Sequence, residues 1–216
     1  MSKIRFTEPN REILARRDSI INDLTRLVDP AGLITSTDEC RAYETDALTA
    51  YRKMPLAVVL PKTTEEVSAV LKYCHDTGVK VVPRGAGTSL AGGAIPSEDA
   101  VVLGLSKMNR VLAVNYDDRF IRVEAGVTNL SVTAVVAENG FFYAPDPSSQ
   151  LACTIGGNIA NNSGGAHCLK YGVTTNNLLG VRMVLIDGSI IDLGGDYLDS
   201  AGIDLLGLVV GSEGQL

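Results

Sequence analysis

The sequence predicts an α+β fold in which a small parallel βαβ part precedes a larger, mostly antiparallel part. Residues 57–82 contain two short apolar runs on either side of a helical pattern, which is the order of a βαβ unit. Residues 178–193 contain two apolar runs joined by Asp187-Gly188, the strongest short hairpin signal in the chain. The 216 residues include 22 glycines and no tryptophan, which is typical of a compact protein with many tight turns.

The chain is expected to begin with one amphipathic helix. Residues 11–27 carry apolar side chains at roughly helical spacing with charged residues between them. Asp29-Pro30 closes this pattern.

The βαβ unit begins at residues 57–60, a short buried strand. Thr63 and Glu66 have the spacing of a capping box, which predicts a helix after them, and Gly78 is its left-handed stop. Residues 79–82 form the second strand. Because a helical crossover joins them, the two strands are expected to be parallel.

The second half of the chain has a different pattern. Residues 111–115 and 120–124 are strand candidates joined by a polar turn, and residues 130–139 form a short helix that Gly140 stops. The hairpin at Asp187-Gly188 follows. Antiparallel pairing therefore replaces parallel pairing.

This change marks a subdomain boundary near residues 108–112, with no flexible linker. The predicted division is a helical lead-in over residues 1–42, a first subdomain over 43–110 and a second over 111–216.

Composition excludes several classes of partner. A net charge of −6 argues against general attraction to nucleic acid or anionic lipid. Residues 1–10 lack the apolar core of a secretory signal, and the longest apolar stretches, such as residues 205–210, are too short to cross a bilayer. We expect a soluble, cytoplasmic protein that binds no nucleic acid and has no transmembrane segment.

The four cysteines, Cys40, Cys74, Cys153 and Cys168, form no CxxC pair, so reduced thiols are expected. Cys153 and Cys168 lie near His167 but lack the paired spacing and the fourth ligand of a zinc site. No metal site is predicted.

Residues 83–93, PRGAGTSLAGG, follow the second strand at the edge where open α/β sheets bind ligands. A dinucleotide fingerprint needs Gly where Leu90 stands, and a P-loop needs Lys and Ser/Thr where Gly93-Ala94 stands. The remaining ligand-binding interpretation is a nest of backbone N–H groups around a pyrophosphate, with Thr88 and Ser89 as further donors. A glycine-rich turn that only links two strands is the alternative.

A second glycine-rich segment favours the ligand-binding interpretation. Residues 145–172, PDPSSQLACTIGGNIANNSGGAHCLKYG, contain two Gly-Gly pairs and a cluster of Asn, Thr and Ser. Two such segments on two subdomains predict one elongated ligand held between them, with its phosphates near the first segment and its organic parts along the second.

Together with GLVVGSEGQL at residues 207–216, these segments resemble in order and wording the FAD-binding domain of the vanillyl-alcohol oxidase and p-cresol methylhydroxylase family. Within it they are most similar to the branch that holds the flavin subunit of glycolate oxidase and the D-lactate and D-2-hydroxyglutarate dehydrogenases. The resemblance covers about residues 43–216. It implies the two-subdomain FAD-binding fold of p-cresol methylhydroxylase type, truncated at the C-terminus.

The resemblance also implies which residues contact FAD. Residues 84–90 would meet the pyrophosphate through their backbone, residues 145–148 would lie beside the flavin or its ribityl chain, and residues 154–164 would follow the cofactor. The implied cofactor-binding residues are Pro83, Arg84, Gly85, Ala86, Gly87, Thr88, Ser89, Leu90, Pro145, Asp146, Ser148, Thr154, Gly156, Gly157, Asn158, Asn161, Ser163 and Gly164. For Asn162 and Asn176, ordinary capping or turn bonding is preferred.

Relatives that attach FAD covalently often have His where this chain has Thr88, which cannot form that bond. Cys153 lies one residue out of register with a second, cysteinyl link. The resemblance therefore implies noncovalent FAD.

The implied reaction is oxidation of a small 2-hydroxy acid, of glycolate or D-lactate type, by hydride transfer to FAD. Such a reaction needs a base, usually His, and a group that holds the carboxylate. His75 falls in the last turn of a predicted helix, where it interacts favourably with the helix C-terminus. His167 follows the second glycine cluster. Position alone makes neither of them catalytic, and no catalytic residue is assigned.

The chain ends where members of the family continue with another strand and a substrate-binding domain. The resemblance thus implies the amino-terminal part of a longer oxidoreductase, inactive by itself, which in the glycolate oxidase case works with other subunits that pass electrons to a membrane pool. The alternative function is a non-catalytic scaffold of the same fold that has lost flavin. The two intact glycine-rich segments favour the flavoenzyme, and the missing fingerprints disfavour an NAD or ATP module.

Overall fold

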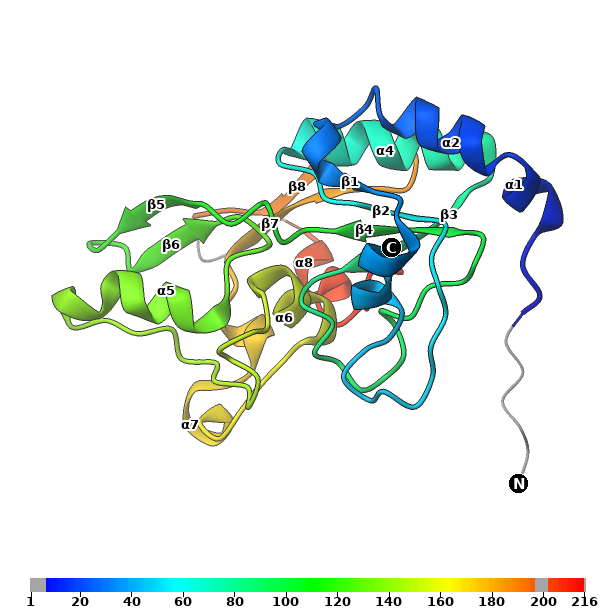
Figure 1. The fold of residues 1–216 in the computed structure, drawn as a ribbon. Helices are drawn as coiled ribbons and strands as arrows, with labels where there is room; N and C mark the ends of the chain where they lie inside the picture. Colours follow the sequence, from blue (N-terminus) through cyan, green and yellow to red (C-terminus); the bar gives the residue numbers. More distant parts are fainter. Residues whose placement is uncertain (1–6, 197–201, 216) are drawn as a thin grey trace.

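The computed structural model describes residues 7–196 and 202–215. Its N-terminal half is built on a four-stranded sheet with the strand order β1-β2-β4-β3 (Figure 1). The strands are β1 (Leu33–Ile34), β2 (Ala57–Val59), β3 (Lys80–Arg84) and β4 (Ala100–Gly104). β1 pairs antiparallel with β2, whereas β2 and β3 each pair parallel with β4.

The two strands of the predicted βαβ unit, β2 and β3, are therefore parallel, but they are not neighbours. β4 lies between them, with Val101 opposite both Ala57 and Val81. Every residue of β4 is buried, so its sequence lacks the alternation that marks a half-exposed strand. This central strand is not predicted from the sequence pattern.

Alternate residues of β2 and β4 face two separate apolar clusters, as the period of a strand requires. Val59 and Val101 pack under the N-terminal helices and α4 (Thr64–Thr77). Val58 and Val102 face the opposite side, where they pack with Cys40. The sheet is thus covered on both faces.

The predicted N-terminal helix is two helices, α1 (Arg11–Ala15) and α2 (Arg17–Leu24). The helical path breaks at Arg16, whose φ is −92° and ψ is 7°. The apolar spacing still has its predicted effect, because Ile20 and Leu24 are fully buried. α2 and α4 lie together on one face of the sheet (Figure 1). On the opposite face, a short helix α3 (Thr37–Cys40) precedes a 3-10 turn.

α4 begins and ends where the sequence predicts. The Thr63 hydroxyl accepts a hydrogen bond from the Glu66 N–H at 3.2 Å, and Gly78 adopts the left-handed conformation with φ 72°. In a full capping box the Glu66 carboxylate would accept from the N–H of Thr63. Here it accepts from the N–H of the preceding residue, Lys62, at 2.6 Å.

The second half contains two antiparallel hairpins and several short helices. The strands are β5 (Val111–Asn115) with β6 (Phe120–Val123), and β7 (Gly180–Val184) with β8 (Ile190–Gly194). The helices are α5 (Asn129–Val136), α6 (Ile155–Asn161), α7 (Cys168–Tyr171) and α8 (Leu205–Val209). Within the described residues the two hairpins form separate two-stranded sheets.

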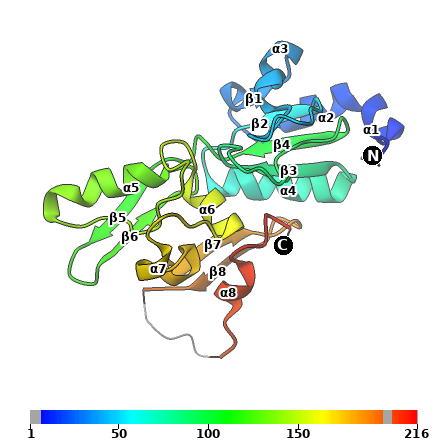
Figure 2. The same ribbon diagram turned by 90° about the horizontal axis from the view of Figure 1, so that it is seen from below.

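Two packing contacts fix these parts against one another. Val132 of α5 and Ile155 of α6 form a third apolar cluster with Val127, so α6 lies between the β5–β6 hairpin and the rest of the molecule (Figure 2). The β7–β8 turn packs on α4, where the Ser68 hydroxyl donates to the Gly188 carbonyl at 2.6 Å. No helix in the described ranges is long and apolar enough to cross a membrane.

Asp99 joins the N-terminal segment to the edge of the sheet. Its carboxylate is 1% exposed and accepts from the Asn10 N–H at 2.9 Å and the Ser97 hydroxyl at 2.6 Å, and its distance to the Lys80 ammonium is 2.8 Å. Burial by itself raises the pKa of Asp99, but these hydrogen bonds outweigh it and lower the pKa to about 2.

Asp99→Asn is expected to lower the free energy of unfolding at pH 7 by about 2 kcal/mol. Because the folded state has the lower pKa, the stabilisation from Asp99 is present above about pH 4 and is lost as the pH falls toward 2. Urea unfolding at pH 7 and at pH 3 measures both effects. Asp38→Asn, at a carboxylate 94% exposed, is the matched control and should change the unfolding free energy by less than about 0.5 kcal/mol. An equal loss for Asp99→Asn at both pH values would contradict the assignment.

Candidate functional site

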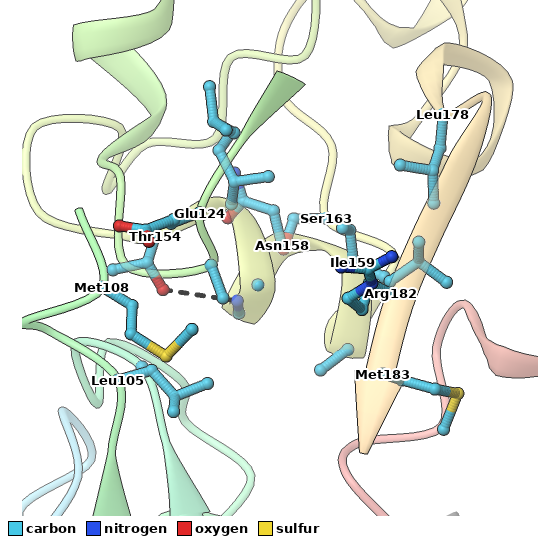
Figure 3. A pocket seen from close by; sticks show the side chains of 18 of the residues that line it. Leu105, Met108, Glu124, Thr154, Asn158, Ile159, Ser163, Leu178, Arg182 and Met183 are labelled. Atoms are coloured by element: carbon cyan, nitrogen blue, oxygen red, sulfur yellow. Dashed lines mark hydrogen bonds between the residues drawn. The ribbon is translucent and has the colours of Figure 1, made fainter. Parts of the chain in front are cut away.

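A cleft of about 2090 Å³ lies between the sheet, the two hairpins and α6. It is larger than the roughly 300–1,000 Å³ usual for small-molecule sites. Figure 3 shows Leu105, Met108, Glu124 and Thr154 on one side and Leu178, Arg182 and Met183 on the β7 side, with α6 between them. Residues from both halves of the chain therefore line one space.

The glycine-rich loop after β3 forms one end of the cleft. Residues 85–90 all line it, and none of their backbone N–H groups donates a hydrogen bond to another described residue. Gly87 has φ 71°, a conformation that favours glycine. The loop thus presents a run of free donors, and free backbone donors of this kind bind anions.

The loop begins on an edge strand, which explains its sequence. Pro83 lies in β3, and β3 has a sheet neighbour on only one side. Proline lacks an N–H, so within sheets it is tolerated at such an edge. Arg84 ends the strand with a buried side chain, which donates to the carbonyls of Thr45 and Ala94 at 2.8 and 3.2 Å.

The N-terminus of α6 meets this loop. A side chain at Gly85 would approach the Thr154 hydroxyl to 2.6 Å, so the two glycine-rich segments touch here. The same hydroxyl caps α6 by accepting from the Gly157 N–H at 3.3 Å. Gly156 packs on Ala125, where a Cβ would come within 2.8 Å of the alanine Cβ. Small residues at these positions let α6 approach both neighbours closely.

Asn158, one turn into α6, is 1% exposed and lines the cleft. Its side-chain Nδ2 is buried and has no hydrogen-bond partner among the described residues. An unpaired buried amide costs free energy, so such groups are rare in folded proteins. Asn158 therefore has a donor available for a ligand.

Charged side chains line the walls beyond the loop. Glu124 is buried and accepts from the N–H of Arg110 at 2.8 Å and from its guanidinium at 2.7 Å. The hydrogen bond from the Arg110 side chain lowers the pKa of Glu124. Across the cleft, Arg182 forms two hydrogen bonds of 2.8 Å with Asp192. Each of these charges thus already has a protein partner.

The last described residues close the cleft beside the loop. The N–H of Glu213 donates to the Ala160 carbonyl at 2.7 Å, and the N–H of Gly211 donates to the Ile159 carbonyl at 2.9 Å, both at the C-terminal end of α6. Gly214 packs on Pro83, where a Cβ would lie 2.7 Å from the proline ring. The motif at residues 207–216 thus lies next to the first glycine-rich segment, up to residue 215.

Most of the site residues predicted from the sequence line this cleft. They are Pro83, Arg84, Gly85, Ala86, Gly87, Thr88, Ser89, Leu90, Thr154, Gly156, Gly157, Asn158, Asn161 and Ser163. Residues about seventy positions apart in the chain are thus brought together, as the interpretation of two cooperating segments requires.

Four predicted residues, Pro145, Asp146, Ser148 and Gly164, do not line the cleft. The Asp146 carboxylate is instead bound to His167, at 2.6 Å from the ring Nδ1 and 3.1 Å from the backbone N–H. His167 does not line the cleft either.

The other polar candidates lie at helix ends, in turns and at the cleft wall. His75 lies in the last turn of α4. Asn162 ends α6 with φ 45°, and its side-chain oxygen accepts from the Thr175 N–H at 3.0 Å. The Asn176 side-chain oxygen accepts from the Val173 N–H at 3.1 Å. Both asparagines thus serve turns and caps. Cys153 is buried at the cleft wall.

Sequence reasoning missed two features of the site. Arg110 and Glu124 flank the β5–β6 hairpin, and its register, with Val111 opposite Val123, could have predicted their contact. Asp46 is 3% exposed and accepts from the Gly92 N–H at 2.8 Å. The contact between Asp46 and Gly92 joins residues 46 positions apart, so a local pattern does not predict it.

Known proteins match this chain over a region that contains both glycine-rich segments. The family model described as "FAD binding domain" matches residues 55–194. The chain is 49% identical over 200 residues to the glycolate oxidase subunit GlcD of Escherichia coli (strain K12). The matched region covers 93% of this chain and 40% of that protein. It is 40% identical over 200 residues to the D-lactate dehydrogenase of Archaeoglobus fulgidus, covering 92% of this chain and 44% of the relative. The chain thus spans less than half the length of these relatives.

Among solved structures, an alkyldihydroxyacetonephosphate synthase superposes with a TM-score of 0.79 at 22% identity, over 99% of this chain and 40% of that one. At this identity the likeness concerns the fold alone. It confirms the α+β fold of p-cresol methylhydroxylase type, and the sequence matches confirm the resemblance drawn from the glycine-rich motifs. The chain belongs to the FAD binding domain family.

Proposed function

We propose that the cleft holds FAD with its pyrophosphate on residues 85–90. The observation that carries this proposal is that residues 85–90 line the cleft and that none of their backbone N–H groups has an acceptor among the described residues. A pyrophosphate supplies several anionic acceptor oxygens close together, which matches a run of donors. Thr88 and Ser89 add hydroxyl groups at the same place.

The second segment supports the same assignment. Gly156 and Gly157 leave room beside the loop, and the unpaired Nδ2 of Asn158 provides a donor for a polar group of the cofactor. Asn161 and Ser163 line the cleft further along. Pro145, Asp146, Ser148 and Gly164 lie outside the cleft, so the contacts proposed with FAD are those of the predicted residues that line it.

The cofactor is proposed to be noncovalent. Thr88 has no nucleophile that forms a flavin bond under ordinary conditions, because a hydroxyl is a weak nucleophile without an adjacent base. Cys153 is 5% exposed. A buried thiol in apolar surroundings is generally unreactive.

For the longer protein we propose oxidation of a small 2-hydroxy acid, the class named in the relatives glycolate oxidase subunit GlcD and D-lactate dehydrogenase. Bound FAD supplies the hydride acceptor in such a reaction. Neither His75 nor His167 lines the cleft, so this chain is proposed to bind and orient the cofactor while the base and the carboxylate-binding group come from elsewhere. The subdomain limits at 43–110 and 111–216, and association with other subunits, are part of the same proposal.

The first experiment is an absorption spectrum of the purified chain after incubation with excess FAD and desalting. We expect retained flavin bands that acid precipitation releases into the supernatant, because the cofactor is held without a covalent bond. Flavin that stays with the pellet would contradict the noncovalent assignment. A folded chain that retains no flavin, as judged by circular dichroism, would favour the scaffold function.

A second prediction concerns Asn158→Leu. We expect at least a tenfold weaker FAD affinity, the equivalent of one lost hydrogen bond of about 1.4 kcal/mol, because the Nδ2 donor is removed. The melting temperature of the FAD-free protein should stay equal or rise, because the variant removes an unsatisfied buried amide. Flavin fluorescence titration and thermal unfolding measure the two quantities.

Asn139→Leu is the matched control, since its amide donates to the Tyr116 hydroxyl at the exposed end of the β5–α5 region. It should leave FAD affinity within twofold of the unchanged chain. An Asn158→Leu variant that melts much lower and binds FAD equally well would show that the amide serves the fold and not the ligand.

A further inference from the structure

Asp46 anchors the far end of the glycine-rich loop from behind. Its carboxylate is 3% exposed and accepts from the N–H groups of Gly92, at 2.8 Å, and Leu48, at 3.0 Å. The neighbouring Ala47 N–H donates to the Ser89 carbonyl at 3.2 Å. The segment around Asp46 thus binds the loop at the Ser89 carbonyl and at the Gly92 N–H. Neither contact uses an N–H group of residues 85–90.

Arg84 anchors the near end. Its guanidinium donates to the Thr45 carbonyl at 2.8 Å and the Ala94 carbonyl at 3.2 Å, and it lies 5.6 Å from the centre of the Tyr43 ring. A Cβ at Gly87 would overlap this guanidinium. The positive group therefore lies directly behind the middle of the loop, and Gly87 has no side chain because the guanidinium occupies that space.

The two buried charges offset one another electrostatically. Burial lowers the pKa of Arg84, and the negative charge of Asp46 acts in the opposite direction. A lone buried carboxylate behind a row of N–H donors would repel an incoming phosphate, because charges interact strongly where water is excluded. The guanidinium behind Gly87 supplies the opposite sign next to the site.

A free loop of this kind would not stay open for a ligand. Glycines have the largest conformational freedom of any residue, and a run of unpaired N–H groups gains hydrogen bonds by rearranging. The Asp46 carboxylate binds the N–H of Gly92 at the exit of the loop. The Arg84 guanidinium binds the carbonyls of Thr45 and Ala94, which lie outside residues 85–90. Neither contact uses an N–H of residues 85–90, and these groups have no acceptor among the described residues.

We propose that Asp46 and Arg84 are positioning residues that hold residues 85–90 in a donor-presenting conformation for a diphosphate. The inference rests on the proposed function, because it assigns how the same loop binds the pyrophosphate of FAD. Both residues act through the loop backbone, and neither side chain is proposed to touch the ligand.

The test compares the unchanged chain with Asp46→Asn and Asp29→Asn, using FAD and ADP as ligands in calorimetric titration. ADP carries the diphosphate and the adenosine without the flavin, so a loss shared by FAD and ADP does not come from contacts to the flavin. Asp29 is the matched control, because its carboxylate also accepts a backbone N–H, from Ala31 at 2.9 Å, but in a turn that does not line the cleft. Circular dichroism sets a temperature at which all three proteins are folded.

We expect Asp46→Asn to weaken FAD and ADP by the same factor of tenfold or more, and Asp29→Asn to change both by less than twofold. Equal affinities for Asp46→Asn and the unchanged chain would overturn the positioning role while leaving FAD binding intact. An unchanged chain that binds neither ligand would overturn the proposed function and this inference with it.

Hydrogen exchange of the unchanged chain provides an independent measurement if Asp46→Asn does not fold. Without ligand, the Gly92 amide should exchange at least tenfold more slowly than the amides of residues 85–90, and addition of ADP should slow the latter. Rapid exchange at Gly92 without ligand would contradict the anchoring contact.

Discussion

Six consecutive backbone N–H groups, at residues 85–90, have no acceptor among the described residues, and the arrangement of this site depends on that constraint. Buried or partly buried backbone donors are nearly always paired, so a run of free ones needs a structure that prevents rearrangement. Here the loop follows the edge strand β3, and the side chains of Arg84 and Asp46 bind the segments on either side of it. The N-terminus of α6 packs against Gly85. The contacts that define the loop thus come from three separate parts of the chain.

The charge of the whole chain does not explain anion binding, because its net charge is −6. Attraction at the loop is local. The N–H dipoles and the buried guanidinium of Arg84 lie within the site, whereas surface charges more than about 10 Å away are screened by salt. Arg110 and Arg182 also line the cleft, but Glu124 and Asp192 neutralise them. The guanidinium of Arg84, which a Cβ at Gly87 would overlap, is a positive group next to the loop backbone.

The hairpins show how far the second half depends on the first. An isolated two-stranded hairpin is marginally stable, so each needs support from other elements. The β7–β8 turn packs on α4 through Ser68 and Gly188, and β6 contributes Ile121 and Val123 to the apolar cluster around α6. The cleft lies between these supports, and its two sides are positioned by contacts to the sheet and to α6.

Local sequence signals determined the parts of the structure that depend on a few neighbouring residues. The cap at Thr63, the stop at Gly78, the turns of both hairpins and the glycine-rich loop follow from short patterns, and the motifs identified the family. Tertiary structure alone decided the features whose partners are distant. β4 lies between β2 and β3 because it pairs with both of them. Its partners in β3 lie 20 residues earlier in the chain, and its partners in β2 lie 44 residues earlier. Likewise, Asp46 accepts from Gly92, and Asp146 pairs with His167 outside the cleft. The side-chain Nδ2 of Asn158 has no partner among the described residues. Burial and pairing are properties of the folded arrangement, and no local pattern of residues encodes them.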